Sequence, residues 1–502
     1  MDLFTRALAL VAPSAALRRA HALRALRAYD AAGNGRRLKN WKTSVSGPVD
    51  EVGNSLAKLR SRSRDLVRNN PYAAHAIAIT VAYQVGFGIM PRPNLGSDRA
   101  NKGIKTLFAD WSKRCDAAGH LDFYGIQALA ARARCQDGEM LVRFYRGTPT
   151  RENPVPLTLQ VLEADQLDDA KSETPSTGNR IANGIEIDAR GKPVAYWLFP
   201  QHPGDAIAMP PRGNASVRIP AEDIIHLYRM DRAGQLRGVP DIAPVTTRMR
   251  GLDDYQEAEL ERARVQACLA AFVTSNGAPN NGPLAGQVPQ GETERRTTFA
   301  PGMIEQLLPG EGVEFVAPPA GGSYDDHTKA VLRAIAVGLG VTYHQLTGDL
   351  TAANYSSLRA GNIDFRRLTG QAQWLMLVPL LCQRVWDEFI RVAILANALR
   401  PRAAGYPVTW VPPAFEAVDP LKDTQAIGQE LDLGLTSPQR AIAAQGEDPD
   451  EILAERAEWK AKAEAAGLGM PAPKPGAPAD DPAADAAPAD DQPADEKPAP
   501  KE

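Results

Sequence analysis

The sequence predicts an α+β protein in which a mixed β region is followed by long helices. Apolar residues alternate with a period of two between Gly138 and Arg229, and they recur with the helical period from Arg64 to Val85 and again beyond Asp241. Gly, Pro, Ser and Asp separate these stretches at the points where elements should begin or end. At 502 residues the chain should bury at least two cores, because single cores stop growing at roughly 250 to 300 residues.

Composition narrows the class of protein. The chain is 44% hydrophobic and 23% charged, which is ordinary for a soluble protein. Its four cysteines form no Cys-x-x-Cys pair, so we expect neither a disulfide framework nor a zinc site: Cys115, Cys135, Cys268 and Cys382. No run approaches the roughly 18 to 20 apolar residues of a membrane span, and the N-terminal residues show no signal-peptide core ending in a cleavage site. We expect a cytoplasmic protein without membrane partner or cofactor.

The two ends of the chain carry opposite charge. Residues 1–45 form a basic arm with nine Arg and Lys residues against two Asp. Such an arm is compatible with a transit-like amphipathic segment, a nucleic-acid-binding segment, or a solvated arm that docks on a neighbour, which we favour. Residues 467–502 are mainly Pro, Ala and Asp without apolar periodicity, so they cannot bury enough surface to offset their ordering entropy. We expect that acidic tail to be disordered.

The first elements follow from local signals. The helical pattern from Arg64 contains Asn70 before Pro71, a suitable N-cap and first-turn pair, and Gly86, Gly88 and Pro91 end the pattern. Four strand-like stretches follow: "GEMLVRFYR", "LTLQVLEADQL", "GIEIDARGKPVAYWLF" with a turn at Arg-Gly, and "SVRIPAEDIIHLYR". We expect them to pair mostly antiparallel.

A long helix is expected over residues 241–274, with Pro244 in its first turn. About thirty residues at ~1.5 Å each give a rod of roughly 45 Å. Glu259 with Arg262 and Glu261 with Arg264 form i,i+3 pairs on it. Small side chains keep its surface narrow enough to pack beside copies of itself, including those of Ala263, Ala267 and Ala270.

A Gly-, Pro- and Asn-rich insertion, residues 275–323, separates this helix from a second one over 324–340. We expect two strands in the insertion, "TTFAPGMIEQLL" and "VEFVAPP", joined by a turn from Pro309 to Gly312. The second helix should begin at Ser323 as N-cap and end at Gly338 and Gly340. Its apolar face consists of Val331, Leu332, Ile335 and Leu339.

The stretch "TGDLTAANYSSLRAG" connects that helix with a further long helix, which Ser356 or Ser357 should cap. After "YPVTWVPP", residues 419–466 should form a helical C-terminal domain of three helices. The first runs from Pro420 to Leu433, and the others open at Ser437-Pro438 and Asp448-Pro449.

Motifs of catalysis are missing from the sequence. It contains no G-x-x-x-x-G-K-[ST], no strand-borne G-x-G-x-x-G, no H-E-x-x-H and no G-x-S-x-G. We interpret His226 as a strand residue with a satisfied ring. The carboxylates of "LEADQLDD" could bind a cation or act as acid and base, but we favour a solvated turn: Glu163, Asp165, Asp168 and Asp169. No nucleophile with an adjacent base accompanies the polar residues of "TGDLTAANYSSLRAG". We expect no enzymatic activity.

Seven stretches, taken in order, resemble the lambda-type phage portal proteins: "RSRDLVRNNPYAAHAIAITVAYQVGFGIMPRP", "VLEADQLDD", "IPAEDIIHLYRMDRAGQLRGVPDIAPV", "DDYQEAELERARVQACLAAF", "PGMIEQLLPGE", "LRAIAVGLGVTYHQLTGDLTAANYSSLRAG" and "VDPLKDTQAIGQELDLGLTSPQRAIAAQGED". The resemblance covers most of residues 30–465. It implies a portal fold with a mixed β/α wing (46–240 and 341–418), a two-helix stem (241–274 and 324–340), a small β clip (275–323) and a helical crown (419–466).

The resemblance also implies a function and partners. Such proteins form a ring, usually of twelve subunits, at one capsid vertex of the virion, and they assemble in the host bacterial cytoplasm. Double-stranded DNA passes through the ring, and the partners are the terminase large subunit, the major capsid and scaffolding proteins, and head-completion proteins. The alternative is another non-enzymatic virion protein, a tail or baseplate component, which should not form closed rings of one size.

Residue roles follow from the same resemblance. The tunnel loop would contain Thr347, Asp349, Thr351, Asn354, Tyr355 and Ser356. The clip would dock the terminase through Pro309, Gly310, Glu311 and Glu314. We expect the loop to be a mobile gate that faces DNA, although Asn354 and Tyr355 could instead only fix the start of the helix that follows.

Overall fold

The computed structural model describes residues 45–175, 178–205, 214–267, 271–275, 311–315, 324–351, 354–415 and 419–467. The chain divides into two compact units, residues 1–424 and 425–502, and each is described by itself. The predicted basic arm and the predicted disordered tail lie outside the described residues, apart from Val45 and Gly467.

Two helices open the described chain, α3 (Pro48–Asn69) and α4 (Pro71–Val85). Asn70 is the N-cap of α4, as predicted, because its side chain accepts a hydrogen bond from the amide of Ala73 at 3.0 Å. The helix predicted from Arg64 begins earlier, at Pro48. Asp50 and Glu51 occupy the first turn of α3, where acidic side chains interact favourably with the helix dipole.

The described residues of the first unit contain four small antiparallel sheets, of which three are described first. β1 (Met90–Pro93) pairs with β11 (Val408–Val411). The three-stranded sheet has the order β3 (Leu157–Leu162), β2 (Glu139–Arg146), β8 (Ile224–Tyr228). The four-stranded sheet has the order β4 (Arg180–Ala182), β5 (Ile185–Ile187), β6 (Pro193–Leu198), β7 (Val217–Pro220). All ladders between these strands are antiparallel, which confirms the prediction.

The largest core lies between the three-stranded sheet and helices from both ends of the unit. Its helices are α5 (Asp98–Ser112), α6 (Phe123–Asp137) and α11 (Gln383–Leu395). The ring of Phe108 meets that of Phe389 edge to face, with centroids 5.1 Å apart. Aromatic packing therefore holds α5 against α11, two helices that are far apart in the sequence. No local sequence pattern predicts this contact.

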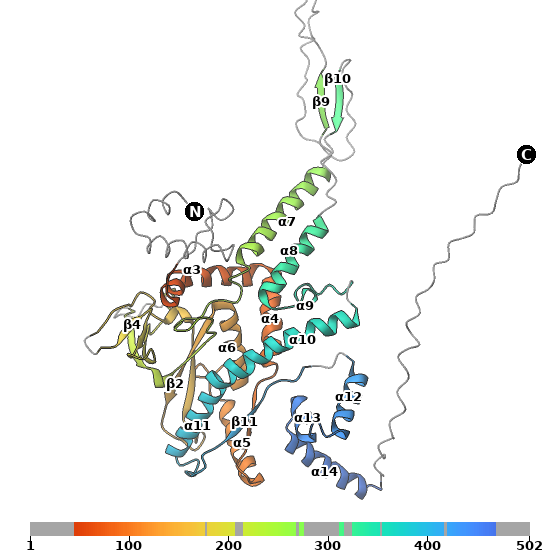
Figure 1. Ribbon diagram of the computed structural model, residues 1–502. Helices are drawn as coiled ribbons and strands as arrows, with labels where there is room; N and C mark the ends of the chain where they lie inside the picture. Colours follow the sequence, from red (N-terminus) through yellow and green to blue (C-terminus); the bar gives the residue numbers. More distant parts are fainter. Residues whose placement is uncertain are drawn as a thin grey trace, which may run out of the picture. The chain divides into compact units, whose positions relative to one another are not determined.

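Helices α7 (Thr246–Ala267) and α8 (Tyr324–Leu339) lie side by side (Figure 1). The helix predicted over 241–274 is wrong at both ends. Residues 241–245 form turns between Pro240 and the helix, and β9 (Ala271–Ser275) follows it as a strand. Phe, Val and Thr in β9 favour a pleated conformation once a partner strand is present. The i,i+3 pairs are confirmed: Arg262 bonds Glu259 at 2.7 Å, and Arg264 bonds Glu261.

The partner of β9 is β10 (Glu311–Phe315), with Glu311 opposite Ser275. This corrects the predicted turn from Pro309 to Gly312, because Glu311 and Gly312 belong to a strand. Pro309, Gly310 and the other predicted strand, residues 297–308, lie outside the described residues. The sequence did not predict this pairing, because the apolar residues of β9 directly follow the Ala-rich end of the predicted helix and were assigned to it.

The apolar face predicted for α8 is confirmed, with Leu332 and Ile335 fully packed in a second core. The predicted end is corrected, because Gly338 lies inside the helix and Gly340 follows it. A Cβ at Gly338 would lie 2.3 Å from Cγ1 of Val245. The glycine therefore serves the close approach of α8 to the turn before α7. Ser323, the predicted N-cap, lies outside the described residues.

The helix predicted after the polar loop is one continuous run of three parts, which crosses the body of the unit (Figure 1). α10 (Tyr355–Ala372) passes into the π-helix η5 (Gln373–Cys382) and then into α11. Pro379 lies within η5, where its missing N–H disturbs regular α-helical bonding. Gln373 ties the run to α4, since its Nε2 donates to the carbonyls of Tyr83 and Gln84, both at 3.1 Å.

The three helices predicted for the C-terminal residues, and the residues predicted to cap the last two, are confirmed. α13 (Pro438–Ala444) is capped by Ser437, and α14 (Pro449–Ala465) is capped by Asp448. α12 (Pro420–Asp432) crosses the boundary between the two units. Within residues 425–467, the side chains of Pro449 and Ala463 are the buried ones.

A buried carboxylate joins the first helix to the three-stranded sheet. Oε1 of Glu139 lies 3.1 Å from Nη1 of Arg60 and 2.6 Å from Nη2 of Arg237, and Oε2 lies 3.0 Å from Nε2 of His226. All four side chains are at most 3% exposed. The prediction that the ring of His226 is satisfied is confirmed.

The acidic run "LEADQLDD" belongs to the same network, which corrects the interpretation of a solvated turn. Arg60 reaches Asp165 at 3.3 Å and Asp169 at 3.1 Å, and Arg237 also pairs with Asp169. Arg64 bonds Asp165 at 2.7 Å. These arginines come from positions far away in the sequence, so inspection of the acidic run alone could not reveal them.

We expect Glu139→Gln to lower the free energy of unfolding by about 3 to 5 kcal/mol, because two buried guanidinium groups would lose their shared counter-charge. Denaturant-induced unfolding measures the change. Asp254→Asn is the matched control, since Asp254 forms an exposed i,i+4 pair with Arg250 and should matter little. Equal effects of the two variants would contradict the structural importance of the network.

The pH dependence of the free energy of unfolding is a second measurement on the Glu139→Gln variant. Burial acts to raise the pKa of Glu139, but the charge of Arg237 and the hydrogen bond with His226 outweigh it and hold that pKa well below its ordinary value. A carboxyl whose pKa is lower in the folded than in the unfolded protein stabilises the fold at pH values above the unfolded pKa of about 4.3. This stabilisation is lost as the pH falls from there toward the folded-state pKa. The stability gap between wild type and Glu139→Gln should therefore narrow between pH 7 and pH 3.

Candidate functional site: the loop between α9 and α10

A short helix, α9 (Tyr343–Thr347), leads into the polar loop. Thr342 caps it through a capping box, in which its hydroxyl accepts from the amide of Gln345 and the Gln345 side chain accepts from the amide of Thr342 at 3.0 Å. Thr347, predicted as a loop residue, is the last residue of α9. The loop therefore runs from Gly348 to Asn354, and Ala352 and Ala353 lie outside the described residues.

Asp349 organises the first half of the loop. Its Oδ1 accepts hydrogen bonds from the amide of Thr351 at 3.0 Å and from the Thr351 hydroxyl at 2.6 Å. The phenol of Tyr343 lies 3.4 Å from the other carboxylate oxygen. The hydrogen bonds from Thr351 lower the pKa of Asp349. The loop thus carries one fixed negative charge at neutral pH.

Asn354 is the N-cap of α10, which corrects the prediction that Ser356 or Ser357 caps this helix. Its side chain accepts from the amide of Ser357 at 2.8 Å, and the Ser357 hydroxyl accepts from the amide of Asn354 at 3.1 Å. An amide cap satisfies a free N–H group as well as a hydroxyl does, and the reciprocal bond makes a capping box. The side chains of Tyr355 and Ser356 lie outside the description.

The titratable side chains at this loop do not form a catalytic pair within the described residues. Burial and the nearby charge of Asp349 raise the pKa of Tyr343, and burial lowers the pKa of His344. A phenol with a raised pKa stays protonated at neutral pH, so it is not available as a general base, and within the described part of the loop no hydroxyl is bonded to a histidine. Leu350 is exposed beside Asp349.

The other residues singled out in the sequence lie on α7 and β10. Ala263 is exposed on α7, whereas the side chain of Ala267 and all of Ala270 lie outside the description. Glu311 and Glu314 lie in β10, at register positions opposite Ser275 and Phe272. The structure of one chain does not bring these residues together with the loop.

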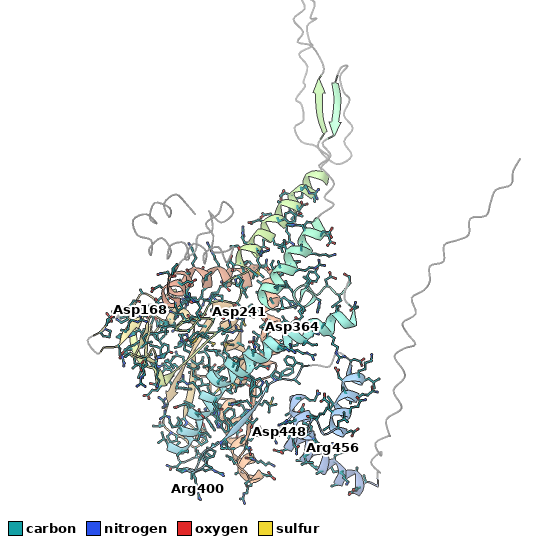
Figure 2. The ribbon with its side chains drawn as sticks, in the orientation of Figure 1. Asp168, Asp241, Asp364, Arg400, Asp448 and Arg456 are labelled. Atoms are coloured by element: carbon teal, nitrogen blue, oxygen red, sulfur yellow. The ribbon has the colours of Figure 1, made fainter. Side chains whose placement is uncertain are left out.

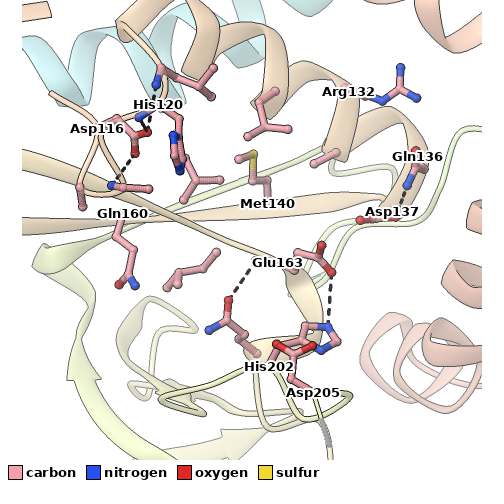
Figure 3. A pocket seen from close by; sticks show the side chains of 18 residues that line it. Asp116, His120, Arg132, Gln136, Asp137, Met140, Gln160, Glu163, His202 and Asp205 are labelled. Carbon is pink, nitrogen blue, oxygen red and sulfur yellow. Dashed lines mark hydrogen bonds and ion pairs between the residues drawn. The ribbon is translucent and has the colours of Figure 1, made fainter. Parts of the chain in front are cut away.

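A cleft of about 740 Å³ lies beside the three-stranded sheet and was not predicted (Figure 3). At one end, Glu163, Asp165 and His202 hold their ligand atoms within 4.8 Å of one another. Nη2 of Arg64 already lies 3.0 Å from Glu163 and 2.7 Å from Asp165. The guanidinium thus supplies the positive charge that a metal ion would bring, and this cluster is part of the ion-pair network.

Comparison with known proteins gives the family. A model of the lambda family of phage portal proteins matches residues 34–373. The chain belongs to that family. The resemblance and the portal function predicted from the sequence are confirmed. No helix among the described residues is long and apolar enough to cross a bilayer.

Two phage portal proteins agree with this assignment. The probable portal protein of Halomonas phage phiHAP-1 is 30% identical over 441 residues, which cover 83% of each chain. The portal protein of Escherichia phage N15 is 26% identical and covers 88% of this portal chain and 91% of its own length. A chain in the virion of a native gene transfer agent particle is similar at 16% identity and a TM-score of 0.46, covering 79% of this chain and 94% of that one.

Replacing Asn354 by Ala should destabilise the start of α10 by about 1 kcal/mol, since the amide of Ser357 loses its acceptor. Faster hydrogen exchange at the first turn of α10 measures this loss. Asn354→Asp is the matched control, because a carboxylate caps equally well and should preserve protection. Unchanged exchange in Asn354→Ala would show that the cap does not hold this end of the loop.

Proposed function

We propose that this portal-family chain forms a closed ring, with twelve subunits the expected number, at one vertex of a phage capsid. Double-stranded DNA passes through the ring during packaging and ejection. The observation that carries this proposal is the family match over residues 34–373. A ring arises when one surface of each subunit binds a different surface of the next and the rotation closes.

The pair α7 and α8 supports a channel wall, or stem, in this proposal. Twelve helices about 10 Å wide, set side by side, have a circumference of roughly 120 Å, hence about 38 Å across at the axes and about 28 Å clear inside. A DNA duplex fits such an opening. Ala263 is exposed in the single chain, and together with Ala267 and Ala270 it would allow neighbouring stems to approach closely.

We further propose roles for the insertion and for the remaining partners. The insertion between α7 and α8, including Pro309, Gly310, Glu311 and Glu314, would be the clip that docks the terminase large subunit. The body of the first unit would be the wing that meets the major capsid and scaffolding proteins, and head-completion proteins would bind after packaging. The protein would act as a conduit without catalysis, assembled in the host cytoplasm and retained in the virion.

The purified chain should form closed rings of one size. Twelve copies of the 54.1 kDa chain give a mass of roughly 650 kDa, which native mass spectrometry and negative-stain imaging can test. A tail or baseplate component would give open polymers or mixed sizes instead. A chain that remains monomeric at every concentration would contradict the proposal.

The loop between α9 and α10 would be a gate that contacts DNA. One fixed carboxylate per subunit at Asp349 would repel phosphate, while neighbouring hydroxyl and amide groups could bond it transiently, so that DNA slides and is retained. Asn354 would serve chiefly as the cap that fixes the gate to α10, because its side-chain oxygen is already bonded to Ser357.

Deleting residues 349–353 should leave ring assembly intact but shorten the packaged DNA or let it escape from filled particles. The deletion spares α9 and the Asn354 cap, so the frame on either side of the loop keeps its bonds. Restriction mapping of packaged DNA and a DNA-retention assay measure the effect. Particles that fill and hold DNA normally would refute the gate, and so would loss of the rings.

A further inference from the structure

Phe87 is an aromatic side chain left almost wholly in solvent. It is 95% exposed, the most of any aromatic residue in the described ranges. It follows α4 in the sequence Gly86-Phe87-Gly88, and Met90 beside it is half exposed. A phenyl ring that stays in water loses the favourable free energy of burial, so its exposed position needs an explanation.

The turn that carries Phe87 is held firmly. Gly86 and Gly88 have φ angles of 51° and 127°, which only glycine adopts easily. A Cβ at Gly88 would lie 2.3 Å from the ring of Tyr124, and one at Gly86 would lie 2.9 Å from Pro413. The two glycines thus pack against Tyr124 and Pro413, whereas the phenyl ring between them lies in solvent.

A buried glutamine locks the residue that follows the turn. The Gln127 side chain accepts from the amide of Ile89 at 2.7 Å and donates to its carbonyl at 3.1 Å, and both residues are fully buried. The exposed position of Phe87 is therefore imposed by its surroundings. From Ala76 to Pro91 the sequence contains no charged residue, so another protein could cover this tip without burying a charge.

A mainly apolar groove of about 740 Å³ lies on the same unit, lined by α8, α10, η5, the residues after β8, and Thr80 and Gln84 of α4. Its walls carry apolar side chains that are more than half exposed: Met230 at 59%, Val337 at 80%, Leu368 at 52% and Leu375 at 73%. Phe365 and Met376 lie buried at its floor. A groove of this size is ample for a phenyl ring and the turn that carries it.

The charges of the groove are already paired. Asp241, labelled in Figure 2, accepts from Arg134 and from Arg229, both at 2.7 Å, and Arg229 also bonds Asp231 at 2.8 Å. An apolar group entering the groove would therefore meet hydrophobic walls and satisfied ion pairs. Phe87 and its supports, Tyr124 and Pro413, are not among the lining residues, so the groove does not receive the phenyl ring of its own chain.

We propose that Phe87 inserts into this groove on the next copy of the chain. A projecting apolar group and a groove of matching chemistry at different places on one molecule give a head-to-tail contact, which is the contact a ring requires. This inference rests on the proposed ring and adds to it one specific pair of surfaces. Each subunit contributes Phe87 to one neighbour and accepts Phe87 of the other.

Cysteine cross-linking of assembled rings tests the contact. Phe87→Cys and Leu375→Cys, combined in a Cys268→Ser background, should yield a ladder of covalent oligomers under mild oxidation. The native Cys115, Cys135 and Cys382 are buried, and burial raises the pKa of the first two to about 12, so they stay protonated and unreactive. Phe87→Cys combined with Val217→Cys is the matched control, since Val217 is exposed on β7 outside the groove.

A ladder for Phe87–Leu375 and none for Phe87–Val217 is the expected result. Rings that form normally but yield no Phe87–Leu375 ladder would overturn the contact while leaving the proposed function intact. A cross-link within one chain, or dimers alone, would overturn it as well, since neither fits a head-to-tail ring. If wild-type chain forms no rings at all, the proposed function fails first. Phe87→Ser should also lower ring yield, whereas Val217→Ser should not.

Discussion

The fold of the first unit depends on the ion pairs of one buried carboxylate. Glu139 begins β2, and its two oxygens are shared by Arg60 of α3, His226 of β8 and Arg237. An uncompensated charge in this interior would cost several kcal/mol, so none of these elements can take its native place without the others. Asp165 and Asp169 of the acidic run form further ion pairs with the same arginines, Asp165 with Arg60 and Asp169 with Arg237. These ion pairs join helix, sheet and loop in addition to the apolar packing between them.

What could be predicted from the sequence is what local chemistry decides. The N-cap Asn70, the apolar face of α8, the alternating pattern of the strands and the caps of α13 and α14 all depend on residues within a few positions of one another. The failures depend on distant partners. β9 is a strand because residues 311–315 pair with it, and the acidic run is neutralised by Arg60 and Arg237. The Asn354 cap was missed because three candidate caps lie within four residues, and only backbone geometry chooses among them.

The loop between α9 and α10 is anchored at both ends by capped helices. On one side a capping box closes α9, and on the other Asn354 begins a helical run that Gln373 ties to α4. Between these anchors, Asp349 and Thr351 bond chiefly to each other and to Tyr343. Local bonds of this kind can break and form again without disturbing the core. The hydrogen bonds of the described loop residues are therefore local, whereas those at its two ends belong to helices.

The shifted pKa values also argue for a structural protein. Strongly shifted groups mark catalytic sites when they lie in a cleft with a reactive partner, and ion-pair networks are the other common cause. Here the carboxylate with the largest depression, Glu139, is fully buried and saturated by arginine, histidine and the amide of Gly238. The buried thiols of Cys115 and Cys135 are made less reactive by their raised pKa. The most strongly shifted carboxylate of the described chain therefore holds helix, sheet and loop together, whereas the exposed charge of Asp349 lies apart from it in the loop between α9 and α10.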